Sequence, residues 1–125
     1  MKTFNYTLNQ KPIESMIDFS IFKNEKNLLI QIFCGEKKDI LEYILNVIAK
    51  ELPQAVCIGS STDGEINNSE ITTLNTVITI SVFKETTLKI VSVDEIDSFS
   101  NGVKLASLLC SEDTKLLITF TDGAK

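Results

Sequence analysis

The sequence predicts an α/β fold: a mixed β-sheet that contains a βαβ unit and an antiparallel hairpin, with helices packed on the sheet. Three observations lead to this prediction. Short apolar segments rich in β-branched residues recur along the chain and have the length of strands. A segment with helical apolar periodicity separates two of them, residues 28–33 and 55–58. Two further strand-like segments, 76–83 and 86–93, are separated only by Lys84-Glu85.

The N-terminal part is predicted to supply a half-exposed strand and a short helix. Phe4, Tyr6 and Leu8 alternate with polar residues, as in a strand with one exposed face. The polar segment that follows ends this strand. Residues 13–22 fit either a short helix or a strand. A short helix after Pro12 is the preferred interpretation, because proline suits the first turn and an acidic residue follows it.

Residues 28–58 form the predicted βαβ unit. The nearly continuous apolar segment 28–33 indicates a central strand, and 55–58 a second one. Between them, apolar residues recur at helical spacing over residues 36–51. Pro53 ends this helix, because the residue before a proline is driven out of helical space. Two strands joined through a helix in this way are expected to be parallel.

Beyond the hairpin, the sequence predicts one more helix and a last strand. Residues 99–110 have helical apolar spacing, and Ser98 or Ser100 can cap that helix. Residues 116–120 are strand-like and are followed by the turn Asp122-Gly123. Because the chain stops so soon after an apolar strand, we expect an open sheet edge and self-association of copies into a homo-oligomer.

The composition excludes several classes of function. The chain has no histidine, and its 12 basic residues are all lysine. A Ser-His-Asp triad, a histidine-ligated metal and a bidentate guanidinium clamp are therefore impossible within it. The net charge of −5 disfavours nucleic acid and anionic membrane surfaces as partners. We accordingly predict no metal, no cofactor and no nucleic-acid partner.

The apolar segments and the cysteines bear on location. No segment has the roughly 18 apolar residues of a membrane span, and the N-terminus lacks the apolar core of a signal peptide. We therefore predict a cytoplasmic protein without membrane insertion. Cys34, Cys57 and Cys110 are odd in number, distant in sequence and set among apolar residues, which predicts buried, reduced thiols. Cys57 is the alternative candidate for a reactive thiol.

The chemically richest segment follows the predicted strand 55–58. Ligands of sheets with crossover helices usually bind at such strand ends. Two interpretations are open. The segment is either a turn whose side chains satisfy nearby backbone N–H groups, or one wall of a ligand site in which hydroxyls hold a carboxylate and an acidic side chain holds an ammonium. The polar side chains concerned are Ser60, Ser61, Thr62, Asp63 and Glu65.

A family resemblance rests on the same segment. Residues 58–65, Ile-Gly-Ser-Ser-Thr-Asp-Gly-Glu, resemble the signature Gly-[Cys/Ser]-[Ser/Thr]-[Ser/Thr]-x-Gly-Glu of the FIST N-terminal domain. The resemblance begins at Leu28 and includes residues 117–123, which are similar to a later strand of that family closing in Asp-Gly; residues 1–27 match poorly. It implies that residues 1–125 are a single partial domain with a C-terminal partner domain.

The resemblance also implies a function. The family, named for F-box and intracellular signal transduction proteins, is regarded as a sensory domain that binds small ligands such as amino acids. For this chain it implies a bacterial sensing module without catalytic residues, whose partner is a following domain or a signalling protein. We place Asp122 at the same sheet edge as the signature segment. The predicted ligand contacts are Ser60, Ser61, Thr62, Asp63, Glu65 and Asp122.

Two other classes of function stay open. The first is a small carboxylate- or thiol-dependent hydrolase or transferase that uses Asp63, Asp122 or Cys57. The second is a structural interaction domain. Without histidine, a catalytic base would have to be a carboxylate, a lysine or a tyrosine.

Overall fold

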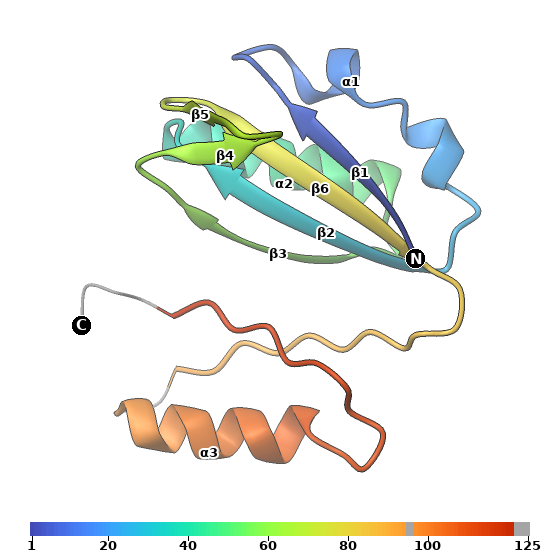
Figure 1. The fold of residues 1–125 in the computed structure, drawn as a ribbon, viewed down its shortest axis with the longest axis vertical. Helices are drawn as coiled ribbons and strands as arrows, with labels where there is room; N and C mark the ends of the chain where they lie inside the picture. Colours follow the sequence, from blue (N-terminus) through green and yellow to red (C-terminus); the bar gives the residue numbers. More distant parts are fainter. Residues whose placement is uncertain (95–96, 122–125) are drawn as a thin grey trace. The chain divides into compact units, whose positions relative to one another are not determined.

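A four-stranded mixed sheet and a separate C-terminal helix are the main features of the computed structural model, which describes residues 1–94 and 97–121. The chain divides into two units, Met1–Leu88 and Lys89–Lys125 (Figure 1). The first unit holds the sheet and the hydrophobic core. The second holds α3, Ser98–Leu109.

The sheet of the first unit has the strand order β1-β6-β2-β3. Central β2 (Asn27–Cys34) pairs in parallel with β3 (Val56–Ser61) and antiparallel with β6 (Thr76–Phe83). β6 also pairs antiparallel with β1 (Lys2–Thr7). α2 (Lys38–Glu51) connects β2 to β3. The predicted βαβ unit, with its parallel strand pair, is therefore confirmed.

The N-terminal segment forms two short helical pieces where one helix was preferred. α1 spans Ile13–Met16, and a 3₁₀ helix spans Phe19–Phe22. The break falls at Ile17, which is extended with φ of −122°. Asp18 then starts the second piece, because its side chain accepts a hydrogen bond from the backbone N–H of Ser20 at 3.0 Å.

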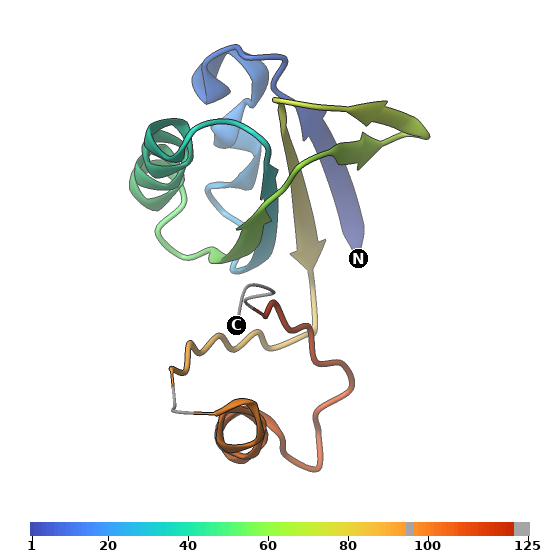
Figure 2. The same cartoon turned by 90° about the vertical axis from the view of Figure 1, so that its left-hand side faces the viewer.

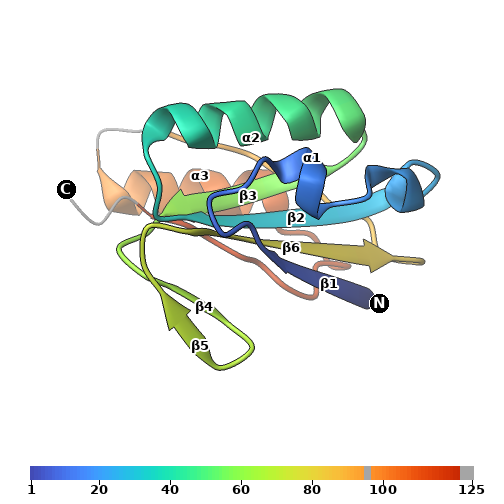
Figure 3. The same cartoon turned by 90° about the horizontal axis from the view of Figure 1, so that it is seen from above.

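The core lies on one face of the sheet, under α1 and α2 (Figure 3). Alternate residues of β2 point into the core. The residues of β6 that pair with them also point into it, so Ile30 and Ile80 lie side by side on the core face of the sheet. Phe22 packs edge-on against Phe4 with ring centroids 5.1 Å apart. Burial of each aliphatic side chain contributes about 1.5–3 kcal/mol. The fully buried apolar residues include Leu8, Ile13, Phe22, Leu28, Ile30, Ile32, Ile44, Leu52, Ile78 and Ile80.

Two predicted strands are absent from the described part of the chain. Residues 86–93 and 116–120 form no strand. The hairpin expected between the first of these and β6 cannot form within this sheet, because β6 is paired on both sides, with β1 and β2. The antiparallel hairpin is instead β4 (Glu65–Asn67) with β5 (Glu70–Thr72). It projects from the sheet on the side away from α2 (Figure 2).

In the second unit, α3 agrees with the predicted helix to within one residue at each end. Its N-cap is Asp97, whereas serines were predicted. The Asp97 carboxylate accepts hydrogen bonds from the backbone N–H of Ser100 at 2.9 Å and from its hydroxyl at 2.7 Å, and these bonds lower the pKa of Asp97. No residue of α3 is buried. The expected packing of this helix on the sheet stays a prediction.

None of the helices in the described part of the chain has the length and apolar character needed to cross a membrane.

Candidate functional site

A pocket of about 460 Å³ opens at the carboxyl ends of β2 and β3, beside the first turns of α2. This is the crevice in which open α/β sheets usually bind ligands. Its polar lining residues lie at the strand ends and at the start of the helix: Glu36, Lys38, Ser60 and Ser61. Of its apolar lining residues, Cys34 ends β2, and the others lie earlier on the strands or later on α2: Ile32, Leu41, Leu45, Cys57 and Ile58.

The parallel register aligns the carboxyl ends of β2 and β3. Cys34, the last residue of β2, is the partner of Ser61, the last residue of β3. Ser60 and Ser61 were expected in a loop, but β3 continues through them and ends three residues later than predicted. Thr62 extends the contact, because its backbone N–H donates to the Cys34 carbonyl at 3.0 Å. Backbone pairing with β2 therefore holds both serines in place.

Two glycines allow the close approaches on which this site depends. A Cβ atom at Gly59 would lie 2.2 Å from the carbonyl oxygen of Ile32. A Cβ atom at Gly35 would lie 2.1 Å from Oε1 of Glu65. Neither glycine has positive φ, so the requirement is for space and not for backbone conformation.

Glu65 is a buried carboxylate, only 2% exposed. The Thr62 hydroxyl donates to its Oε1 at 2.6 Å, and the Thr72 hydroxyl approaches its Oε2 at 3.3 Å. Burial of a carboxylate without partners would be strongly unfavourable. Here the side chain ties the loop after β3 to β5 and rests against Gly35. It is not one of the residues that line the pocket.

Glu36 is held at the pocket by the start of β6. The Thr76 hydroxyl lies 2.6 Å from Oε2 of Glu36 and 3.3 Å from Sγ of Cys34. A hydroxyl carries one proton, so it donates to one of these atoms at a time. Beside it, the backbone N–H of Gly35 donates to the Asn75 carbonyl at 2.7 Å. The turn before β6 thus fixes the end of β2.

Comparison with known protein families decides the identity of the chain. Residues 28–125 match the model of the FIST N domain. The chain belongs to the FIST N domain family. Membership indicates a sensory domain of signal transduction and confirms the resemblance seen in residues 58–65. No curated protein and no solved structure gives a significant match.

Within this FIST N domain, the predicted ligand contacts lie in different environments. Ser60 and Ser61 line the pocket. Thr62 and Glu65 do not line the pocket, and the Thr62 hydroxyl donates a hydrogen bond to the Glu65 carboxylate. Asp63 is exposed and does not line the pocket.

Asp122 lies outside the described residues. The prediction that it forms an opposite wall of the site therefore stays a prediction.

Sequence reasoning missed Glu36 and Lys38 as members of the site. Residues 36–51 were predicted only as the helix of the βαβ unit, from their apolar spacing. The available signal was position, because both residues directly follow β2 in a βαβ unit, where the strand's carboxyl end meets the crevice. Lys38 pairs with Glu42 at 3.5 Å, and these side chains are 89% and 61% exposed. Such an exposed pair is weak, so the ammonium of Lys38 is available to a ligand.

The cysteines are free, as predicted, but their burial differs. Cys34 is buried, Cys57 is partly buried and Cys110 is exposed. The prediction of burial is therefore wrong for Cys110, which follows a helix without buried residues. Burial raises the pKa of Cys57 to about 11. Little thiolate forms at neutral pH, which disfavours Cys57 as a nucleophile in this FIST N domain.

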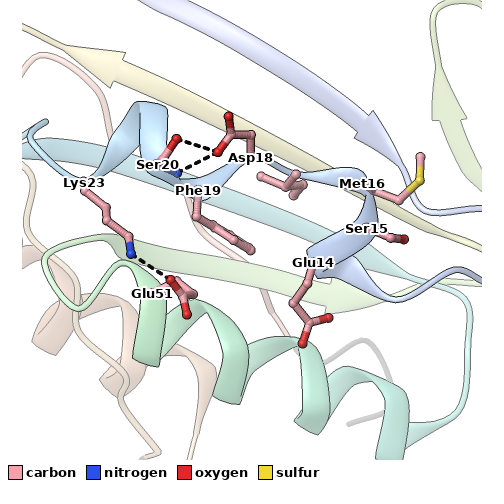
Figure 4. Close-up of a pocket in the computed structure, with 9 residues that line it drawn as sticks. Glu14, Ser15, Met16, Asp18, Phe19, Ser20, Lys23 and Glu51 are labelled. Atoms are coloured by element: carbon pink, nitrogen blue, oxygen red, sulfur yellow. Dashed lines mark hydrogen bonds and ion pairs between the residues drawn. The ribbon is translucent and has the colours of Figure 1, made fainter.

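A second hollow, of about 610 Å³, lies between the N-terminal helical pieces and α2 (Figure 4). Its charged groups are already partnered by the protein. Lys23 pairs with Glu51 at 3.1 Å, and Glu14 accepts a hydrogen bond from the Tyr43 hydroxyl. Asp18 caps the 3₁₀ helix. The N-terminal part of this hollow also lies outside the residues that match the family, so the pocket at β2 and β3 is the better candidate site.

Proposed function

We propose that this FIST N domain binds a small zwitterionic, amino-acid-like molecule in the pocket at the carboxyl ends of β2 and β3. One observation carries the proposal. Groups able to hold a carboxylate and a group able to hold an ammonium line the same pocket, within the residues that match the family. A sensory domain needs a site that is accessible and specific. This pocket is open to solvent and combines a few polar side chains with an apolar lining, as small-molecule sites generally do.

The carboxylate of such a ligand would be held by Lys38 and Ser61. Ser61 pairs with Cys34, which is buried on the side of the sheet that α2 covers, so its side chain lies on that side as well. An ammonium and a hydroxyl are hydrogen-bond donors, and charge-assisted bonds are the stronger ones. Ser60 precedes Ser61 in the strand, so its side chain points to the opposite face, where its hydroxyl donates to the Ser61 carbonyl at 2.9 Å.

The ammonium of the ligand would be held by Glu36. One of its carboxylate oxygens accepts from Thr76, which fixes the orientation of the group. The residue is partly exposed at the pocket. A carboxylate held in place in this way binds an ammonium with less loss of side-chain entropy than a free one would.

We further propose that the domain catalyses no reaction of its own. The chain has no histidine to act as a base, and the raised pKa of Cys57 leaves it mainly as a thiol. The output would be conformational. Hydrogen bonds lead from the pocket through Thr62 and Glu65 to Thr72 in the β4–β5 hairpin. Ligand binding would shift this arrangement between two states that a partner domain or a signalling protein reads, in a bacterial cell.

A thermal-shift screen of the common amino acids against the full 125-residue chain tests the proposal. A ligand that binds only the folded state raises the melting temperature, by an amount that corresponds to about 2.7 kcal/mol at 100 times its Kd. Lys38→Ala should weaken binding at least about tenfold, through loss of a charge-assisted hydrogen bond. Lys37→Ala is the matched control, because Lys37 is adjacent and exposed but does not line the pocket.

The proposal fails if no amino acid raises the melting temperature. It also fails if Lys37→Ala and Lys38→Ala weaken binding equally, because the effect would then be one of general charge.

A further inference from the structure

We infer that the ligand of this pocket carries an aliphatic chain, so that the domain prefers amino acids with hydrocarbon side chains over those with polar or charged ones. This inference rests on the proposed function, since it concerns the same site. It starts from the distribution of polar and apolar residues along the pocket.

The lining changes from polar to apolar along both elements that form the pocket. On α2, Lys38 stands at the start, and Leu41 and Leu45 follow one and two turns later on the pocket side. On β3, Ser61 ends the strand, and Cys57 lies four residues before it. The polar groups thus gather at the carboxyl end of the strands, and the inner part is apolar.

The length of this gradient fits a small amphipathic molecule. Seven residues separate Lys38 from Leu45, which corresponds to roughly 10 Å along a helix at 1.5 Å per residue. That distance accommodates a zwitterionic head at Glu36, Lys38 and Ser61 and a short hydrocarbon chain beyond it. A head group alone would leave the inner apolar surface in contact with water.

The apolar part of the pocket lining offers few hydrogen-bond partners to a polar ligand side chain. Leu41, Leu45 and Ile32 have no hydrogen-bonding side-chain atoms, and the thiol of Cys57 is a weak donor. A ligand amide or charge placed there would lose part of its hydration and gain no partner from these side chains. A hydrocarbon chain would instead cover the side chain of Leu45, which is 41% exposed.

The first test compares ligands matched in shape. Isothermal titration calorimetry with the full chain should show leucine binding at least tenfold more tightly than asparagine, and valine more tightly than threonine. Tighter binding of the polar member of each pair, or equal binding within each pair, would overturn the inference and leave the proposed function standing. Absence of binding by every amino acid would overturn both.

The second test compares two variants of α2. Leu45→Gln should lower the affinity for leucine at least tenfold and leave the affinity for alanine, which has almost only the head group, within twofold. Ile40→Gln is the matched control, since Ile40 is 37% exposed on the same helix and does not line the pocket. Circular dichroism checks that both variants keep their helices. Equal losses of leucine and alanine binding in Leu45→Gln, or no loss of either, would overturn the inference.

Discussion

The two units of this FIST N domain differ in whether their apolar side chains are buried. In the first unit, the apolar sides of β1, β2, β6 and α2 pack together and form one buried hydrophobic cluster. In the second, none of the described residues is buried. Phe99 of α3 is 80% exposed and Val103 is 56% exposed. Both units contain a helix with apolar periodicity, but only α2 has buried residues, Ile44 and Ile48.

The difference teaches that periodicity and capping determine where a helix forms, whereas burial depends on a partner surface. α2 is flanked in sequence by the two strands with which it packs, so its apolar side is covered by its neighbours. α3 is started locally by Asp97. A strand likewise depends on a partner. The apolar composition of residues 116–120 favours a strand, but no other strand pairs with them in the described chain, and they form none.

The largest expected effect is on the core of the first unit. Ile30→Ala should lower the free energy of unfolding by about 2–5 kcal/mol, because it leaves a cavity at a position that is 0% exposed. Val103→Ala in α3 should change it by no more than about 0.5 kcal/mol. Urea unfolding monitored by circular dichroism measures both. Similar losses of unfolding free energy in the two variants would contradict the difference in burial between the two units.

A smaller effect is expected at the close approach beside the pocket. Gly35→Ala should cost about 1–3 kcal/mol, as overpacking does elsewhere, because the new methyl group would meet the Glu65 carboxylate. In a Glu65→Ala background the cost of Gly35→Ala should fall by roughly 1 kcal/mol or more, since residues in contact are not additive. A double-mutant cycle in urea measures the coupling. Additive costs would show that the Gly35–Glu65 contact does not limit the fold.

The corresponding substitution in the second unit should have the opposite sign. Gly102 lies inside α3, has no positive φ, and a Cβ atom there would meet nothing within 4 Å. Gly102→Ala should therefore stabilise the helix by about 0.4–1 kcal/mol. Far-ultraviolet circular dichroism and amide hydrogen exchange of α3 measure the change. Destabilisation by Gly102→Ala would mean that α3 has a close neighbour.

The smallest expected effect is the pH dependence of the α3 cap. Hydrogen bonds from Ser100 lower the pKa of Asp97 below its ordinary value of 3.8. The stabilisation from this carboxylate is therefore complete above the unfolded pKa and is lost as the pH falls through the folded one. The protection factors of the α3 amides, which correct hydrogen exchange for its intrinsic pH dependence, should fall below about pH 4, and Asp97→Ala should remove that step. Asp113→Ala, which alters a carboxylate outside the helix, should retain it.

The sequence predicted the parts of the fold whose signals are local. The βαβ unit, β6 and α3 have their periodicity and breaking residues within short windows. The antiparallel partner of β6 was assigned wrongly, because its true neighbour β1 is distant in sequence, as in the pairing of Tyr6 with Ile78. Ser60 and Ser61 were assigned to a loop because their strand conformation comes from pairing with β2, which polar composition does not reveal.

The candidate site was predictable only where its signal is local in sequence. The hydroxyl residues that directly follow an apolar strand predicted Ser60 and Ser61 as site residues. The role of Glu65 as a buried support depends on Gly35 and Thr72, which reach it only through the fold. Glu36 and Lys38 line the pocket because they directly follow β2, whose carboxyl end lies beside that of β3.

Protection of a thiol from labelling reports whether a small zwitterion occupies the pocket at β2 and β3. Cys57 lines the pocket, and exposed Cys110 in the second unit serves as an internal reference. At pH 9, where a thiol with a pKa of about 11 still reacts measurably, methyl methanethiosulfonate labelling is followed by mass spectrometry with and without saturating leucine. We predict slower labelling of Cys57 and unchanged labelling of Cys110. Unchanged labelling of Cys57 at saturating leucine, or equal slowing of both thiols, would contradict the claim.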